Sequence, residues 1–138
     1  TMSEWDDFTV TPARESAARA FAMAGVSPAD IDVLQVYDSF TITVLLTLEA
    51  MGFCGPGEAG AFVEGGRLRL DGDLPTNTDG GGLSSNHPGM RGLFLIIEAA
   101  RQLRGEAEGR QVRGARLAAV NGTGGWFSST GTLVLGVE

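Results

Sequence analysis

The side chains best suited to chemistry in this sequence surround its only histidine, His87. It follows residues 77–86, which read Asn-Thr-Asp-Gly-Gly-Gly-Leu-Ser-Ser-Asn, and it precedes Pro88 and Gly89. Three consecutive glycines can take positive φ at little cost and approach another group closely, and an unperturbed imidazole titrates near neutral pH. Next to a helix N-terminus, such a loop could hold an oxyanion. The segment is therefore a candidate catalytic loop, although a plain glycine turn before a helix, with His87 on the surface, explains the same pattern.

Two further segments carry candidate groups. Tyr37, the only tyrosine, and Asp38 stand where a predicted strand meets a helix, and ligands gather at the carboxyl ends of strands in open α/β sheets. A core aromatic and a helix cap are the alternatives for these two residues. Residues 121–125 (Asn-Gly-Thr-Gly-Gly) predict a tight turn, but they lack the third glycine of a dinucleotide-binding motif. Residues 82–86 likewise lack the last glycine of a nucleophile elbow, which disfavours a serine hydrolase.

The composition excludes several classes of protein. The 138 residues, 43% of them hydrophobic, predict one globular domain. A net charge of −7 argues against a nucleic-acid partner. The lack of a long apolar run and of a signal-peptide pattern predicts a cytoplasmic protein without a membrane span. All ten basic residues are arginine, which excludes a Schiff-base lysine, and one histidine with one cysteine, Cys54, makes no metal cluster.

Hydrophobic periodicity predicts the elements that position these groups. A helix is expected to begin at Thr11, which can cap it, and to end at Gly25. A buried strand is predicted at 33–37. The helix that follows, 40–51, is predicted to turn these side chains to the core: Phe40, Val44, Leu45, Leu48 and Met51.

The second half of the chain completes the predicted sheet. Alternation at 67–72 predicts a short hairpin, and strands are predicted at 116–120 and 130–137. Helix 90–103 is predicted to pack through Leu93, Ile96, Ile97, Ala100 and Leu103. The predicted fold class is α/β, a mixed β-sheet with helices packed on its faces. Both glycine-rich segments and Tyr37 are expected at one rim of that sheet.

Three blocks, in this order, resemble the C-terminal half of the thiolase superfamily. They are residues 33–40 (Val-Leu-Gln-Val-Tyr-Asp-Ser-Phe), residues 77–89 with their His-Pro-Gly ending, and residues 121–132 (Asn-Gly-Thr-Gly-Gly-Trp-Phe-Ser-Ser-Thr-Gly-Thr). The second block is the most specific, because it resembles the family's Asn-x-x-Gly-Gly…Gly-His-Pro pattern. The resemblance implies a thiolase C-terminal-like domain at 11–138 after an N-terminal extension at 1–10, with the N-terminal catalytic half absent. The branch that the blocks resemble is that of the lipid-transfer, sterol-carrier-type thiolases.

The resemblance also implies roles for individual residues. His87 matches the His-Pro histidine, which activates the nucleophile and helps to bind the thioester oxygen. Tyr37 stands where most members have an Asn or His that helps to form an oxyanion hole. Asn121 stands at the block where Claisen thiolases carry a cysteine acid/base, and Cys54 lies too far away in sequence to replace it. The other residues implied in the oxyanion and active-site loops are Asn77, Gly81, Gly82, Gly122, Gly124 and Gly125.

Two departures from the family pattern, Tyr37 in place of Asn or His and Asn121 in place of a cysteine, point to a particular chemistry within the family. A branch that resembles these thiolases performs retro-aldol cleavage of β-hydroxyacyl-CoA thioesters in steroid side-chain breakdown, and tyrosines act there. The reaction needs a base and a stabilised enolate but no covalent cysteine, and Tyr37 with His87 could supply both.

The resemblance implies a homodimer, a coenzyme A thioester as substrate, no further cofactor, and a small OB-fold acyl-CoA-binding protein as partner. Thiolysis stays an alternative to retro-aldol cleavage. So does a non-catalytic acyl-CoA-binding or assembly module that another chain completes.

Overall fold

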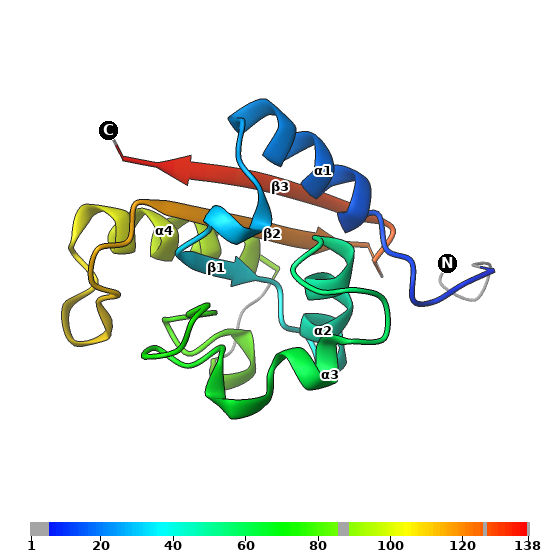
Figure 1. The fold of residues 1–138 in the computed structure, drawn as a ribbon, viewed down its shortest axis with the longest axis horizontal. Helices are drawn as coiled ribbons and strands as arrows, with labels where there is room; N and C mark the ends of the chain where they lie inside the picture. Colours follow the sequence, from blue (N-terminus) through cyan, green and yellow to red (C-terminus); the bar gives the residue numbers. More distant parts are fainter. Residues whose placement is uncertain (1–5, 86–88, 126, 138) are drawn as a thin grey trace.

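The computed structural model describes residues 6–85, 89–125 and 127–137, which form a mixed sheet with helices on both faces (Figure 1). In chain order the elements are α1 (Ala13–Ala24), β1 (Val33–Val36), α2 (Thr41–Ala50), α3 (Ala59–Phe62), α4 (Arg91–Arg104), β2 (Leu117–Gly124) and β3 (Ser129–Gly136). The sheet order is β1-β2-β3, with β1 and β2 parallel and β2 and β3 antiparallel. The predicted α/β class and mixed sheet are confirmed.

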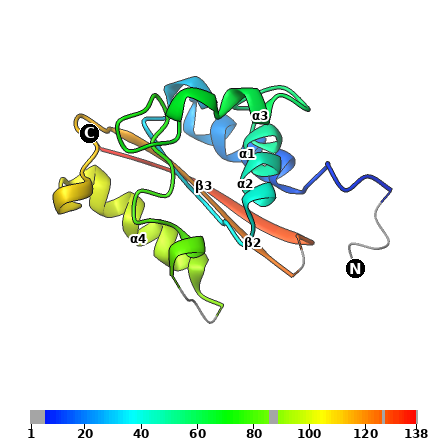
Figure 2. The ribbon, with the colours of Figure 1, turned by 90° about the horizontal axis from the view of Figure 1, so that it is seen from below.

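The sheet separates two hydrophobic cores. Figure 2 shows α4 on one side of the strands and α1 and α2 on the other. Successive strand residues point to opposite faces, so Leu34 joins the core under α1 and α2, whereas Val33 joins the core under α4. The α1-side core is the larger, and its buried members include Phe21, Val36, Leu48, Met51 and Ala119. The α4-side core contains Val33, Leu95, Ala99, Ala118 and Val120.

The first helix ends as predicted but begins differently. Gly25 takes a φ of 69° at the C-terminus, where its N–H donates to the carbonyl of Ala22. At the N-terminus the capping position is Pro12, so the predicted cap at Thr11 is wrong. The Thr11 hydroxyl is buried and has no hydrogen-bond partner among the described residues.

The second helix buries most of the predicted face. Leu48 and Met51 lie in the α1-side core and Val44 packs against it, as predicted. Phe40, also predicted for the core, is 66% exposed and stands just before α2. Thr43 and Thr47 are buried as well. Each hydroxyl donates to a backbone carbonyl one turn earlier, at 2.6 Å and 2.7 Å, which removes the cost of burying it.

No strand forms at 67–72, so the predicted hairpin is wrong. The N–H of Arg69 donates to the carbonyl of Gly66, and the N–H of Gly72 donates to the carbonyl of Arg69, giving successive turns. The chain then reaches the sheet at Thr76, which bridges Leu34 of β1 in parallel. This contact brings the following glycine-rich loop to the edge of β1.

The last helix, α4, is where predicted, but its buried face is only partly the predicted one. Ile96 and Leu103 pack against the α4-side core as predicted, whereas Leu93 and Ile97 are 57% and 41% exposed. The buried residues of this helix are Arg91, Leu95, Glu98, Ala99 and Gln102. They keep helical spacing, yet three of the five are polar, and a pattern of apolar residues alone therefore finds only part of the buried face.

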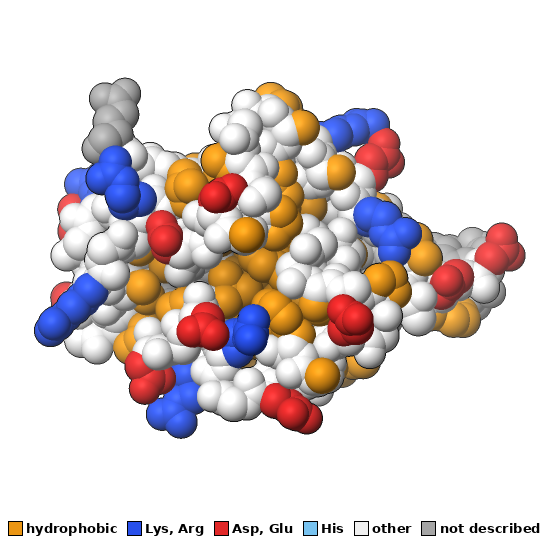
Figure 3. Space-filling view, in the orientation of Figure 1, with side chains coloured by type: hydrophobic (Ala, Val, Ile, Leu, Met, Phe, Trp, Pro, Cys, Tyr) orange, Lys and Arg blue, Asp and Glu red, His pale blue; other side chains and the backbone are white. Residues whose placement is uncertain are grey.

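On the side of the sheet that carries α1, hydrophobic side chains gather across the middle of the surface and charged ones surround them (Figure 3). A cavity of about 360 Å³ lined by Phe53, Phe62 and Leu74, among other residues, lies near Ile31, at the amino end of β1. The cavity is thus at the opposite end of β1 from the candidate catalytic residues.

Candidate active site at the carboxyl end of the sheet

The candidate residues gather where β1 and β2 end. Tyr37 and Asp38 directly follow β1, and the N–H of Tyr37 donates to the carbonyl of Asn121 on β2 at 3.0 Å. A side-chain carbon built on Gly122 would lie 3.5 Å from the Cα of Gly92, so β2 approaches the first turn of α4 closely. The predicted common rim is therefore present for the described residues.

Asn77 fixes the start of the glycine-rich loop to β1. Its backbone N–H donates to the carbonyl of Leu34, and its side-chain Oδ1 accepts the N–H of Val36, both at 2.9 Å. Its φ of 50° is unusual for a residue other than glycine but is tolerated by asparagine. The amide side chain thus extends the ladder of the sheet, so its observed role is structural.

Two of the three glycines are required by space as well as by conformation. Gly80 and Gly81 take φ values of 97° and 75°. A Cβ on Gly81 would lie 2.1 Å from Oδ2 of Asp38, and one on Gly80 would lie 2.6 Å from Oγ of Ser84. The loop can therefore fold against Asp38 only because Gly81 carries no side chain, and Gly80 leaves room for the hydroxyl of Ser84.

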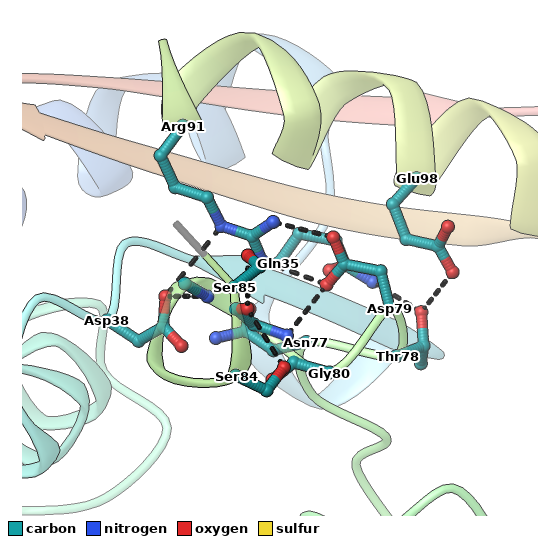
Figure 4. A network of polar contacts seen from close by, with 12 residues as sticks. Gln35, Asp38, Asn77, Thr78, Asp79, Gly80, Ser84, Ser85, Arg91 and Glu98 are labelled. Carbon is teal, nitrogen blue, oxygen red and sulfur yellow. Dashed lines mark hydrogen bonds and ion pairs between the residues drawn. The ribbon is translucent and has the colours of Figure 1, made fainter. Parts of the chain in front are cut away.

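A cluster of charges holds this loop, and two of its three members, Arg91 and Asp38, are buried (Figure 4). Asp38 accepts the N–H of Gly82 at 2.8 Å and that of Leu83 at 3.2 Å. Asp79 accepts the N–H of Gly81 at 2.9 Å. Arg91, the first residue of α4, donates two hydrogen bonds to Asp79, at 2.6 Å and 2.8 Å, and its Nε lies 3.7 Å from Oδ1 of Asp38.

Two members of the cluster, Asp79 and Arg91, favour their charged forms. Burial alone would raise the pKa of Asp79, but the hydrogen bonds from Arg91 and Gly81 outweigh it and hold this pKa below its usual range. The same pairing with Asp79 raises the pKa of Arg91. Asp38 was expected to cap α2. Its carboxylate instead accepts hydrogen bonds from two backbone N–H groups of the loop, those of Gly82 and Leu83.

These bonds bear on the implied role of Gly81 and Gly82. Both N–H groups already donate to protein carboxylates, whereas an oxyanion hole needs donors aimed at the substrate oxygen. In the observed arrangement the two glycines shape the loop. Their implied role as oxyanion donors stays a prediction.

Tyr37 and Asn121 are adjacent in the backbone, but their side chains lie on opposite sides of the sheet. Tyr37 is half-buried and packs against the core under α4. Asn121 is fully buried and donates from Nδ2 to the hydroxyls of Thr130 and Thr132, the second of which contacts Ser16 of α1. Only Tyr37 therefore shares a side with the loop and α4.

The second glycine segment is mostly strand. β2 continues to Gly124, so Gly122 and Gly124 are paired with β3, and the predicted tight turn begins later, at Gly125 with a φ of 50°. The Thr130 hydroxyl donates to the carbonyl of Gly122 at 2.9 Å. His87 lies outside the described residues, and its predicted role stays a prediction.

The sequence prediction missed three charged residues of this region: Asp79, Arg91 and Glu98. Glu98, two turns after Arg91, accepts hydrogen bonds from Thr78 at 2.7 Å and from Arg110 at 2.9 Å. The spacing of Arg91, Glu98 and Gln102 on one side of α4 was a usable signal. It could have shown a polar face turned toward partners in the loop.

Three further observations concern metal binding, the cysteine and membranes. Within the described ranges, no group of three or more His, Cys, Asp or Glu side chains could hold a metal ion. Burial raises the pKa of the Cys54 thiol, with nearby Glu49 and Glu58 adding to the effect, and Cys54 packs against the core under α1. Among the helices described, none has the length and apolarity to cross a membrane.

Comparison with known proteins gives consistent relatives. An acetyl-CoA acetyltransferase of Methanothermobacter thermautotrophicus is 44% identical over 121 residues, which cover 86% of this chain and 32% of that protein. A steroid side-chain-cleaving aldolase of Thermomonospora curvata is 39% identical over 118 residues, covering 86% of this chain and 29% of the relative. A solved chain of "Ltp2-ChsH2(DUF35) aldolase" superposes with a TM-score of 0.86 at 34% identity, covering 99% of this chain and 35% of the other.

This chain thus spans about a third of the length of these relatives. The family described as "Thiolase C-terminal domain-like" matches residues 1–137. The match includes residues 1–10, and the predicted boundary between an extension and the domain stays a prediction. Sequence, fold and relatives agree that the chain belongs to the thiolase C-terminal domain-like family.

Proposed function

We propose that the chain is the C-terminal domain of a lipid-transfer thiolase-like enzyme that performs retro-aldol cleavage of β-hydroxyacyl-CoA thioesters. The observation that carries the proposal is the position of Tyr37, half-buried at the end of β1, on the α4 side of the sheet. The similarity to a steroid side-chain-cleaving aldolase supports this choice over thiolysis. Steroid or other lipid degradation is accordingly the proposed setting.

In the proposed reaction a base removes the proton of the β-hydroxyl group. The Cα–Cβ bond then breaks, the β-carbon leaves as a carbonyl, and its bonding electrons pass to the thioester as an enolate. A proton added to the α-carbon completes the shortened acyl-CoA. We assign the proton transfers and the enolate contacts to Tyr37 and His87, which are the titratable side chains that the family resemblance places there.

The remaining predicted site residues form the walls of this site in the proposal. Asn77, Gly81 and Gly82 shape the loop on one side. Asn121 and the glycines at 122, 124 and 125 shape the rim of β2 and β3. The substrate is a coenzyme A thioester, and the reaction as written uses no further cofactor.

We further propose a cytoplasmic homodimer that works with an OB-fold acyl-CoA-binding partner. The similar solved chain belongs to an aldolase whose name joins two components, Ltp2 and ChsH2(DUF35), which supports a partner protein. Exposed apolar side chains at Leu83, Met90 and Leu93 are consistent with a surface that another chain covers.

The test uses the complete polypeptide that its reading frame encodes. It should release a ketone or aldehyde from a β-hydroxyacyl-CoA, and Tyr37→Phe should lower this turnover by roughly a hundredfold or more. Release of acetyl-CoA from a β-ketoacyl-CoA with free coenzyme A would instead indicate thiolysis. Binding of acyl-CoA without turnover of either substrate would favour the alternative of a non-catalytic binding or assembly module.

A further inference from the structure

The loop that follows Asn77 is held by charges that no part of the proposed mechanism uses. Three consecutive N–H groups, from Gly81 to Leu83, end on the carboxylates of Asp79 and Asp38. Both carboxylates also pair with the guanidinium of Arg91. These bonds hold the backbone of the loop in place, and they occupy the carboxylates that could otherwise react.

The shielding of Arg91 and Asp38 from water restricts how far the members of the cluster can move relative to one another. The side chains of Arg91 and Asp38 are 2% and 4% exposed, and Asp79 is 23% exposed. Charge-assisted hydrogen bonds shielded from water are stronger than surface pairs, and a paired arginine with two planar hydrogen bonds to one carboxylate fixes orientation as well as distance. The loop therefore has little freedom to move relative to α4.

The cluster also joins three separate segments of the chain. Asp38 directly follows Tyr37, Asp79 lies at the start of the glycine loop, and Arg91 opens α4 (Figure 4). A shift of the Asp38 carboxylate would have to move Gly82 and Leu83 with it. The position of the loop is thus coupled to the backbone that carries Tyr37.

A second buried ion pair on α4 binds side chains and none of the backbone N–H groups of Gly81–Leu83. Glu98 is 2% exposed and accepts hydrogen bonds from the side chains of Arg110, Gln102 and Thr78, the last of which directly precedes Asp79. Its partner Arg110 belongs to the short 3₁₀ helix Glu108–Arg110. The Arg110–Glu98 pair therefore provides a control on the same helix.

We propose that Asp38, Arg91 and Asp79 are positioning residues that hold the Gly80–Gly82 loop at a fixed place relative to Tyr37, and so align the acyl-CoA thioester for cleavage. The alignment part rests on the proposed function. The holding part does not, because it concerns the loop itself. The two parts are tested by different measurements.

The first measurement is amide hydrogen exchange of Gly81, Gly82 and Leu83 at neutral pH. Asp38→Asn keeps the shape of the side chain but loses its charge and one acceptor, so exchange at Gly82 and Leu83 should accelerate by roughly tenfold or more. Asp79→Asn should do the same at Gly81. Arg110→Gln should leave all three amides protected. Unchanged protection in both aspartate variants would overturn the proposal.

The second measurement is steady-state turnover of a β-hydroxyacyl-CoA by the complete polypeptide. Asp38→Asn and Asp79→Asn should lower kcat by roughly ten- to a hundredfold with little change in KM, because misalignment slows the chemical step. Arg91→Lys keeps the charge but loses the paired geometry, and should restore part of the rate lost in Arg91→Met. Arg110→Gln should retain kcat.

The outcomes separate the two proposals. A wild-type protein without retro-aldol turnover, but with faster exchange in the aspartate variants, would reject the proposed function and keep the holding role. An active protein whose kcat is the same in Asp38→Asn, or falls equally in Arg110→Gln, would reject the positioning role and keep the function.

Discussion

The buried face of α4 carries two polar clusters, one built around a buried cation and the other around a buried anion. At the first turn a buried cation, Arg91, stands between two carboxylates that bind backbone N–H groups. Two turns later a buried anion, Glu98, is surrounded by side-chain donors. The first cluster fixes the backbone of the glycine loop at Gly81–Leu83, whereas the second joins the helix to Arg110 and to the side chain of Thr78, where the loop begins. The same face of one helix thus holds loop backbone at its first turn and side chains two turns later.

The largest difference between the clusters should appear when each loses its arginine. Arg91 is 2% exposed and faces two carboxylates, so Arg91→Met leaves both Asp38 and Asp79 without their cation, and we expect a loss of about 3–5 kcal/mol in the free energy of unfolding. Arg110 is 33% exposed, and Glu98 keeps Thr78 and Gln102 as donors in Arg110→Met. The expected loss there is about 1–2 kcal/mol. Urea unfolding of both variants checks this, and equal losses would contradict the comparison.

Between the clusters the helix relies on apolar packing. Leu95 is fully buried in the core under α4. Leu95→Ala should lower the free energy of unfolding by about 2–5 kcal/mol, through lost burial and the cavity that remains. The matched control is Ile96→Ala, at a half-buried position of the same core, which should cost less. Thermal unfolding of both variants, followed by circular dichroism, tests the order.

The glycine loop offers a test of how tightly Gly81 is constrained. Gly105 ends α4 in the left-handed region, with φ 72° and ψ 22°, and a Cβ there would meet open space. Gly81 has φ 75° and ψ 174°, a conformation open essentially to glycine alone, and a Cβ there would also collide with Asp38. Gly105→Ala should therefore cost about 1 kcal/mol. Gly81→Ala should cost about 2–3 kcal/mol, because the backbone is more strained and the carboxylate must also move. Equal costs in the denaturant midpoints would contradict both constraints on Gly81.

The sequence predicted the main elements and the common rim because these depend on local signals. The strand at 33–36, the helix ending at Gly25 and the helix from 91 to 104 all follow from periodicity and glycine stops. Family resemblance also brought Tyr37 and the glycine loop together. In the structure Asn77 and Asp38 fasten the loop beside the end of β1, while the catalytic roles of these residues stay predictions.

The buried face of α4 could not be predicted in the same way. Apolar periodicity selected Leu93 and Ile97, which are exposed, and ignored Arg91 and Glu98, which are buried. A buried charge is tolerated only when a partner far away in sequence compensates it, and here Asp79 and Arg110 do so. The helical spacing of these polar residues can be read in the sequence, but the partners that let them be buried are a property of the fold. The same reason explains why Asp38 looked like a helix cap.

The pH dependence of stability should report both clusters. The pKa of Asp79 is lowered despite its burial, and so is that of Glu98, because hydrogen bonds from Arg110, Thr78 and Gln102 outweigh burial. A lowered pKa in the folded state stabilises above the unfolded value of about 4, and this stability is lost as pH falls through the folded-state value. Asp79→Asn and Glu98→Gln should each flatten the acid slope of the unfolding free energy. A slope that neither variant changes would contradict the charged form of both clusters.

The smallest effect is expected on the outer face of α4. Leu93 is more than half exposed, and Gln is also a good helix former, so Leu93→Gln should change the free energy of unfolding by less than about 0.5 kcal/mol. This near-zero value is the counterpart of the large loss expected for Leu95, two residues along the same helix. The measurement is urea unfolding of this chain at two protein concentrations. A loss that approaches that of Leu95→Ala at the lower concentration would mean that Leu93 belongs to the core, and the assignment of the two faces would be wrong. A loss confined to the higher concentration would instead locate Leu93 in a contact between copies, consistent with the proposed dimer.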